Sequence, residues 1–98
     1  MVVTFLEAHV EPDKAAVLEQ SYHEALRQLD AGIAQTTLLR GTRDPNLWRI
    51  ETVWQSREAL EAMRASGQTP RGVLIFRSAG AEPALSVFAV VEQAAAPA

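Results

Sequence analysis

Alternating apolar and polar residues predict four β-strands in this chain. Residues 2–10, 33–40, 47–54 and 84–92 each have the period of two that is typical of a strand. The turn-like composition of residues 41–46 predicts that the second and third strands form a hairpin. The two faces of the first strand consist of Val2, Thr4, Leu6, Ala8 and Val10 on one side and Val3, Phe5, Glu7 and His9 on the other.

A period of three to four residues predicts a helix between the first two strands. Pro12 and Asp13 suit its first turn, and Gly32 suits a left-handed stop after Asp30. The predicted buried stripe consists of Ala15, Leu18, Tyr22, Ala25 and Leu29.

A second helix is predicted after the third strand, with Ser56 as its N-cap, Leu60 and Met63 on its apolar side and its end near Gly67. Residues 68–83 are ambiguous, because the short apolar run 73–76 fits either a strand or a short helix.

The element order β-α-β-β-α-β predicts a single ferredoxin-like α+β domain with a four-stranded antiparallel sheet over residues 1–93, followed by a flexible Ala-rich tail, residues 94–98. The first and last strands are apolar on both faces, and an uncovered apolar sheet face is unusual for a monomer. We therefore predict a homodimer formed through a sheet face. We expect the face with Val2 and Leu6 to be the interface or a barrel interior, and the face with Glu7 and His9 to meet the helices.

The composition of the chain excludes several kinds of site and partner. The 98 residues carry a net charge of -3 and no cysteine, which excludes disulfides and thiolate sites and argues against nucleic acid as a partner. No apolar run reaches the roughly 20 residues of a membrane helix, and the first residues do not resemble a signal peptide, so we expect a cytoplasmic protein that does not bind membranes. The two histidines lie on different elements and no phosphate loop occurs, so we expect neither a metal site nor a cofactor.

Two segments carry a family resemblance. Residues 50–60 read Ile-Glu-Thr-Val-Trp-Gln-Ser-Arg-Glu-Ala-Leu, and residues 85–91 read Leu-Ser-Val-Phe-Ala-Val-Val. They resemble the third-strand segment and the closing strand of the antibiotic biosynthesis monooxygenase (ABM) family. The resemblance implies a dimeric α+β barrel. It also implies a function among cofactor-independent oxygenases of aromatic polyketides, quinol oxygenases, haem-degrading enzymes or members without assigned activity.

The haem-degrading branch of that family implies three residues: an Asn on the first strand, a Trp ending the third strand and a His after the second helix. Trp54 matches the Trp, whereas Glu7 occupies the expected Asn position and residues 67–76 contain no His. The resemblance therefore does not favour haem degradation.

Trp54, Glu7 and His9 are the candidate catalytic residues. The indole of Trp54 could wall an aromatic pocket, or it could pack against the second helix. Glu7 and His9 share a face of the first strand, where either could take a proton from a bound phenol. The alternative is that Glu7 pairs with Arg49 across the sheet while His9 lies at the exposed strand end.

Four further residues are candidates for substrate binding: Tyr22, Met63, Arg71 and Phe76. Tyr22 and Phe76 could equally be core residues. We expect a monooxygenase that oxidises a quinol or a polyketide-like phenol without a cofactor. The alternative is a non-catalytic small-molecule-binding or structural dimer that shares only the fold.

Overall fold

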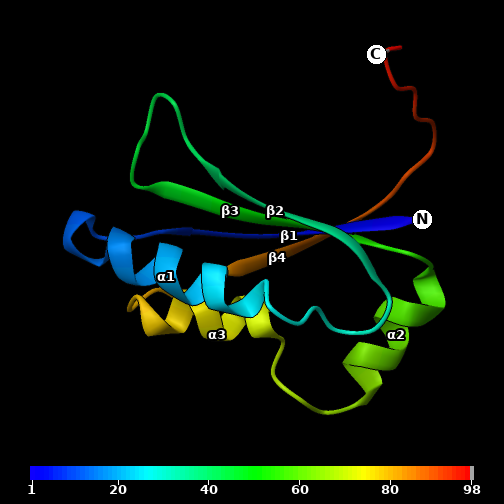
Figure 1. Cartoon of the computed structure of the whole chain (residues 1–98), viewed down its shortest axis with the longest axis horizontal. Coiled ribbons are helices and arrows are strands. Elements are labelled where there is room, and N and C mark those ends of the chain that lie inside the picture. Colours follow the sequence, from blue (N-terminus) through cyan, green and yellow to red (C-terminus); the bar gives the residue numbers. More distant parts are fainter. Residues whose placement is uncertain (98) are drawn as a thin grey trace.

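The computed structural model describes residues 1–97 as a four-stranded antiparallel sheet with helices on one face (Figure 1). The spatial order of the strands is β2-β3-β1-β4. This confirms the predicted α+β fold, with one additional helix. The elements in chain order are β1 (Val2–His9), the 3-10 helix η1 (Pro12–Lys14), α1 (Ala15–Ala25), β2 (Ile33–Arg40), β3 (Leu47–Trp54), α2 (Arg57–Ala65), α3 (Arg71–Ser78) and β4 (Ala84–Ala89).

The two strands of the predicted hairpin have the expected bounds, but three other predictions were too long. β1 ends at His9 rather than Val10. β4 ends at Ala89 rather than Glu92. The first helix ends at Ala25, well before Gly32, and Leu29 is exposed. Strand pairing explains why the helix ends early. Ile33 pairs with Trp54, so the chain must leave α1 and turn back before it reaches that position.

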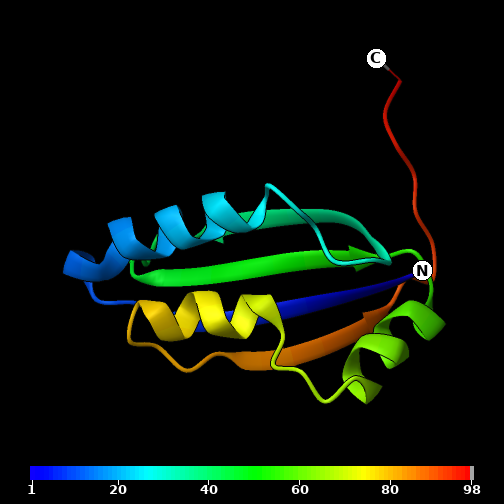
Figure 2. The ribbon, with the colours of Figure 1, turned by 60° about the horizontal axis from the view of Figure 1, so that its bottom comes forward.

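Residues 68–83 contain a third helix, α3, which resolves the ambiguity in favour of a helix. Figure 2 shows α1 and α3 lying over the same face of the sheet, whereas α2 lies beyond one end of it, and α1 contacts α3. The second helix of the sandwich is therefore α3 and not the predicted helix that begins after Ser56. That helix, α2, has the expected cap, since the Ala59 N–H donates to Ser56 Oγ at 3.1 Å.

The helices cover the face of the sheet opposite to the one that we expected. Val2, Thr4 and Val10 are buried beneath them, and Leu6 and Ala8 pack against the same core. Period-two alternation could not decide this point, because β1 is apolar on both faces. Cross-strand pairing decides it, because it brings the large apolar side chains of β3 to the same face as Leu6 and Ala8.

The core between sheet and helices has two parts. The larger part contains the fully buried side chains of Val10, Leu18 and Phe76 together with Trp48 and Ile50. The smaller part lies at the other end of β1, where Val2, Trp54 and Leu60 pack together and fix α2. Trp48 is thus structural, and the guanidinium of Arg40 lies 4.8 Å from its ring centroid.

Gly32 permits α2 to approach the start of β2. Its φ angle is +89°, a conformation that favours glycine, and a Cβ atom there would lie 2.6 Å from the Cβ of Ala59. The carbonyl of Gly32 accepts a hydrogen bond from the Gln55 N–H at 2.8 Å. This contact holds the α1–β2 loop beside the end of β3. In residues 1–97 no helix is long and apolar enough to cross a membrane.

Candidate active site

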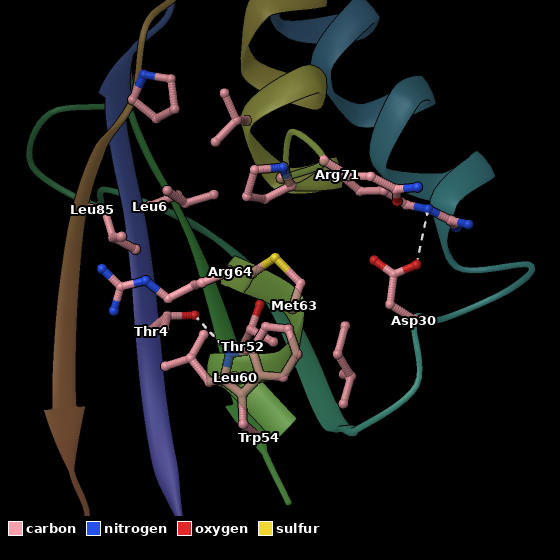
Figure 3. Close-up of a pocket in the computed structure, with 16 residues that line it drawn as sticks. Thr4, Leu6, Asp30, Thr52, Trp54, Leu60, Met63, Arg64, Arg71 and Leu85 are labelled. Carbon is pink, nitrogen blue, oxygen red and sulfur yellow. Dashed lines mark hydrogen bonds and ion pairs between the residues drawn. The ribbon is translucent and has the colours of Figure 1, made fainter. Parts of the chain in front are cut away.

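A cavity of about 340 Å³ lies between the helix-covered face of the sheet and the segment that runs from α2 to α3. Figure 3 shows side chains from β1, β3, β4, α2 and the start of α3 around it. Most of its wall is apolar, and the principal apolar side chains are Leu6, Trp54, Leu60, Met63 and Leu85. A concave, mainly apolar site with a few polar groups is typical of small-molecule binding.

Trp54 forms the floor of this cavity at the end of β3. Its side chain is buried, and its Nε1–H donates to Thr4 Oγ1 at 3.1 Å (Figure 3). The ring contributes both to the cavity wall and to the small core with Leu60. Trp54 thus lines the cavity and packs against α2 at the same time, and its indole N–H already has Thr4 as its partner.

Three charged residues line the cavity: Asp30, Arg64 and Arg71. Asp30 follows α1, and its Oδ1 lies 3.4 Å from Arg71 Nε. Arg71 also donates to the backbone carbonyl of Gln28, so it fastens the start of α3 to the α1–β2 loop. In Figure 3 one carboxylate oxygen of Asp30 meets Arg71, whereas the other points back towards the cavity. Asp30 is thus the carboxylate available to a ligand in this lining.

Glu7 and His9 lie on the opposite, open face of the sheet, so the structure does not bring them to Trp54. Glu7 pairs with Arg49, whose Nε donates to Glu7 Oε1 at 3.0 Å. His9 Nε2 lies 2.8 Å from Asp44 Oδ2 in the β2–β3 loop. This hydrogen bond, together with one from the Asn46 backbone N–H, holds the pKa of the Asp44 carboxyl below its usual value. The alternative interpretation of Glu7, an ion pair across the sheet, is the one that the geometry supports.

The four predicted binding residues divide into two groups. Met63 and Arg71 line the cavity. Phe76 is fully buried in the larger core and does not line it, so that expectation was wrong. Tyr22 lies in a separate, smaller depression, where its hydroxyl donates to Thr36 Oγ1 at 3.1 Å.

Asp30 and Arg64 are the charged cavity residues that the sequence reasoning missed. Asp30 stood within a pattern that indicated a helix end, and Arg64 within the polar side of α2, so neither carried a signal of its own. The two side chains come from the α1–β2 loop and from α2, and they meet at one cavity only in the folded chain. Among residues 1–97 no group of three or more His, Cys, Asp or Glu side chains could hold a metal ion.

The first-strand residue that faces Trp54 is Thr4, not Glu7. Thr4, rather than Glu7, therefore corresponds to the first-strand Asn of the haem-degrading pattern. Thr4 is not an Asn, so this position still differs from the pattern. In the described part of the chain, the cavity lining also contains no histidine. The arrangement thus provides an apolar, indole-walled cavity with one carboxylate and two guanidinium groups.

Solved structures of other proteins share this fold. A candidate antibiotic biosynthesis monooxygenase from Deinococcus radiodurans superposes with a TM-score of 0.72 at 18% identity, over all of both chains. A variant of MhuD with two manganese protoporphyrin IX molecules per active site superposes with a TM-score of 0.70 at 20% identity, over 98% of this chain and 100% of that one. SnoaB, a cofactor-independent oxygenase from Streptomyces nogalater, gives 0.62 at 19% identity, over 94% and 95%.

At such identities these structures establish the fold alone. No curated protein sequence matches the chain. The sequence profile named "antibiotic biosynthesis monooxygenase" does match, and it covers residues 1–71, which include Trp54, α2 and every charged residue of the cavity. This chain belongs to the antibiotic biosynthesis monooxygenase family.

Proposed function

We propose that this protein is a cofactor-independent monooxygenase that oxidises a small planar aromatic, a quinol or a polyketide-like phenol, in the cavity beside Trp54. The observation that carries the proposal is the cavity itself. Its volume of about 340 Å³ suits a small ring system, and its wall is mainly apolar, with the indole of Trp54 as a flat surface. Membership of the family and the fold shared with the oxygenase SnoaB support the same chemistry.

The proposed reaction needs no external reductant. A phenol whose ring tautomerises to a form with a CH₂ group loses a proton, and the resulting anion passes one electron to dioxygen. The two radicals combine into a peroxide at that carbon, and the peroxide loses water to leave a carbonyl. R₂CH₂ and O₂ thus give R₂C=O and H₂O. All four electrons come from the substrate, and one oxygen atom remains in the product.

We assign the role of the base to Asp30, in place of Glu7 and His9. Its cavity-facing oxygen takes the first proton and returns it to the peroxide before water leaves (Figure 3). Arg71 is a positioning residue, because its ion pair at 3.4 Å holds the other oxygen of Asp30. The apolar wall excludes water from the anion, which favours electron transfer to an apolar oxidant such as dioxygen.

A panel of quinols and polyketide-like phenols, incubated with and without air, tests the proposed activity. We expect oxygen-dependent turnover, with one atom of ¹⁸O₂ in the product and the other in water. Substrate conversion that proceeds equally without oxygen would contradict the proposal. Thermal stabilisation by these ligands without turnover would instead identify the alternative, a protein that binds small molecules without catalysis.

We also propose a homodimer, through the open face of the sheet rather than the face first expected. On that face the rings of Phe5 and Phe88 meet edge to face with centroids 5.6 Å apart. All of β4 is exposed in the single chain, and on the open face Phe88 retains 55% of its surface. An apolar edge strand exposed on both sides is a surface that soluble proteins normally cover.

Substituting Phe88→Glu is expected to raise the dimer dissociation constant at least about 30-fold, because it places a charge beside Phe5 in the apolar part of the proposed interface. Sedimentation equilibrium of the variant and the wild type measures the change. Leu74→Glu is the matched control, since Leu74 is equally exposed but lies on α3, in the helical layer. A wild-type protein that is monomeric at micromolar concentration, or a dimer unaffected by Phe88→Glu, would refute this interface.

A further inference from the structure

The charges around the cavity are not balanced. Asp30 and Arg71 form an ion pair with each other. The carboxylate that pairs with Arg64 is Glu61, one turn earlier on the same helix, at 4.0 Å, and both side chains are more than half exposed. Such a surface pair contributes little. Because its pair with Glu61 is long and exposed, Arg64 keeps guanidinium N–H groups available to an anionic ligand in the cavity.

Arg64 lies at the opposite side of the cavity from Asp30. Figure 3 shows its side chain extending from α2 towards β1 and β4, close to Leu85 and above Thr4, whereas Asp30 lies beside the α1–β2 loop. The guanidinium of Arg64 thus lies at one end of the apolar cavity, and Asp30, the proposed base, lies at the other end. A ligand that spans the cavity meets Asp30 at one end and Arg64 at the other.

This arrangement has a chemical complement. A guanidinium presents parallel N–H donors that match the two oxygens of a carboxylate, and the two groups form a charge-assisted, bidentate pair. We infer that the substrate is an aromatic carboxylate, bound with its carboxylate on Arg64, its rings against Trp54 and Met63, and its phenol towards Asp30. The inference rests on the proposed function and adds the anionic group that the substrate must carry.

A matched pair of ligands tests the inference. The ligand 6-hydroxy-2-naphthoate and its methyl ester have the same rings and phenol, but only the acid is charged. Dissociation constants are measured by calorimetry under anaerobic conditions, so that binding is separated from turnover. We expect the wild type to bind the acid about tenfold or more tightly than the ester, as a charged hydrogen-bonded pair implies. This preference should weaken as salt is added.

The Arg64→Gln variant is expected to lose the preference for the acid, and Arg64→Lys to keep part of it. Arg57→Gln is the matched control, because it removes the same charge from the first turn of α2, outside the cavity lining, and should retain the preference. Circular dichroism checks that each variant is folded.

Two results would overturn the inference. If acid and ester bind equally to the wild type, or if the preference survives in Arg64→Gln, Arg64 does not recognise a carboxylate, while the proposed oxidation of a neutral phenol stands. If neither ligand binds to the wild type, the cavity is not an aromatic site, and the proposed function falls with the inference.

Discussion

The Asp30→Asn variant is expected to lower kcat/KM for a phenolic substrate by roughly 100-fold, the lower end of what a general base contributes. Asparagine keeps the shape of the side chain but cannot take up a proton at neutral pH. The loss should fall mainly on kcat, because the apolar wall and Trp54 still bind the ring. Steady-state oxygen consumption with the best substrate of the panel measures both constants.

Two controls separate proton transfer from structure in this experiment. Asp44→Asn makes the same chemical change in the β2–β3 loop, on the side of the sheet away from the cavity, and should leave kcat/KM unchanged. The exposed ion pair of Asp30 with Arg71 contributes at most about 1 kcal/mol, so Asp30→Asn should remain folded. If its kcat/KM stays within a few-fold of the wild-type value while the fold is intact, Asp30 is not the base.

The strands and their order along the chain followed from the sequence because their signals are local. Alternation defined β2 and β3 to the residue, and the turn composition of residues 41–46 paired them. The N-cap of α2 was equally readable, since a Ser at the start of a helical pattern is a local signal, and its hydroxyl oxygen accepts from the Ala59 N–H.

Which face of the sheet meets the helices could not be predicted from the sequence. β1 offers Val2 and Leu6 on one face and Val3 and Phe5 on the other, so both faces are suited to burial. The choice depends on which large side chains of β3 and α3 lie opposite, and that is a property of the tertiary fold. Because Glu7 was assigned to the wrong face, the predicted site combined residues from both sides of the sheet.

The cavity itself was predicted only in part for the same reason. Trp54, Met63 and Arg71 were identified from their positions around the end of β3 and the segment after α2. Asp30 reaches the cavity because α1 ends early and the following loop turns back to β3, where Gly32 bonds Gln55. A helix that continued to Asp30 would have carried its carboxylate away. The error in the helix length therefore also explains why Asp30 was missed as a cavity residue.

Trp54→Ala is expected to lower the free energy of unfolding by about 3–5 kcal/mol, the usual range for truncating a buried Trp. Trp54 joins β3, β1 and α2, since its ring packs with Val2 and Leu60 and its N–H bonds Thr4. Urea unfolding at a fixed protein concentration measures the loss. The fixed concentration is needed because a dimer would make the apparent stability depend on it.

The hydrogen bond between Trp54 and Thr4 can be separated from the packing of the ring. Trp54→Phe keeps an aromatic ring in the wall and removes the donor, whereas Thr4→Val removes the acceptor and leaves a buried N–H unpaired, at a cost of about 1–3 kcal/mol. Because each single variant breaks the same bond, the double variant should be less destabilised than the sum of the two. Strict additivity would mean that the bond contributes nothing to stability.

A Trp54→Ala protein as stable as the wild type would show that the indole is not part of the core. Its role would then be confined to the cavity wall, and only the binding of aromatic ligands should suffer.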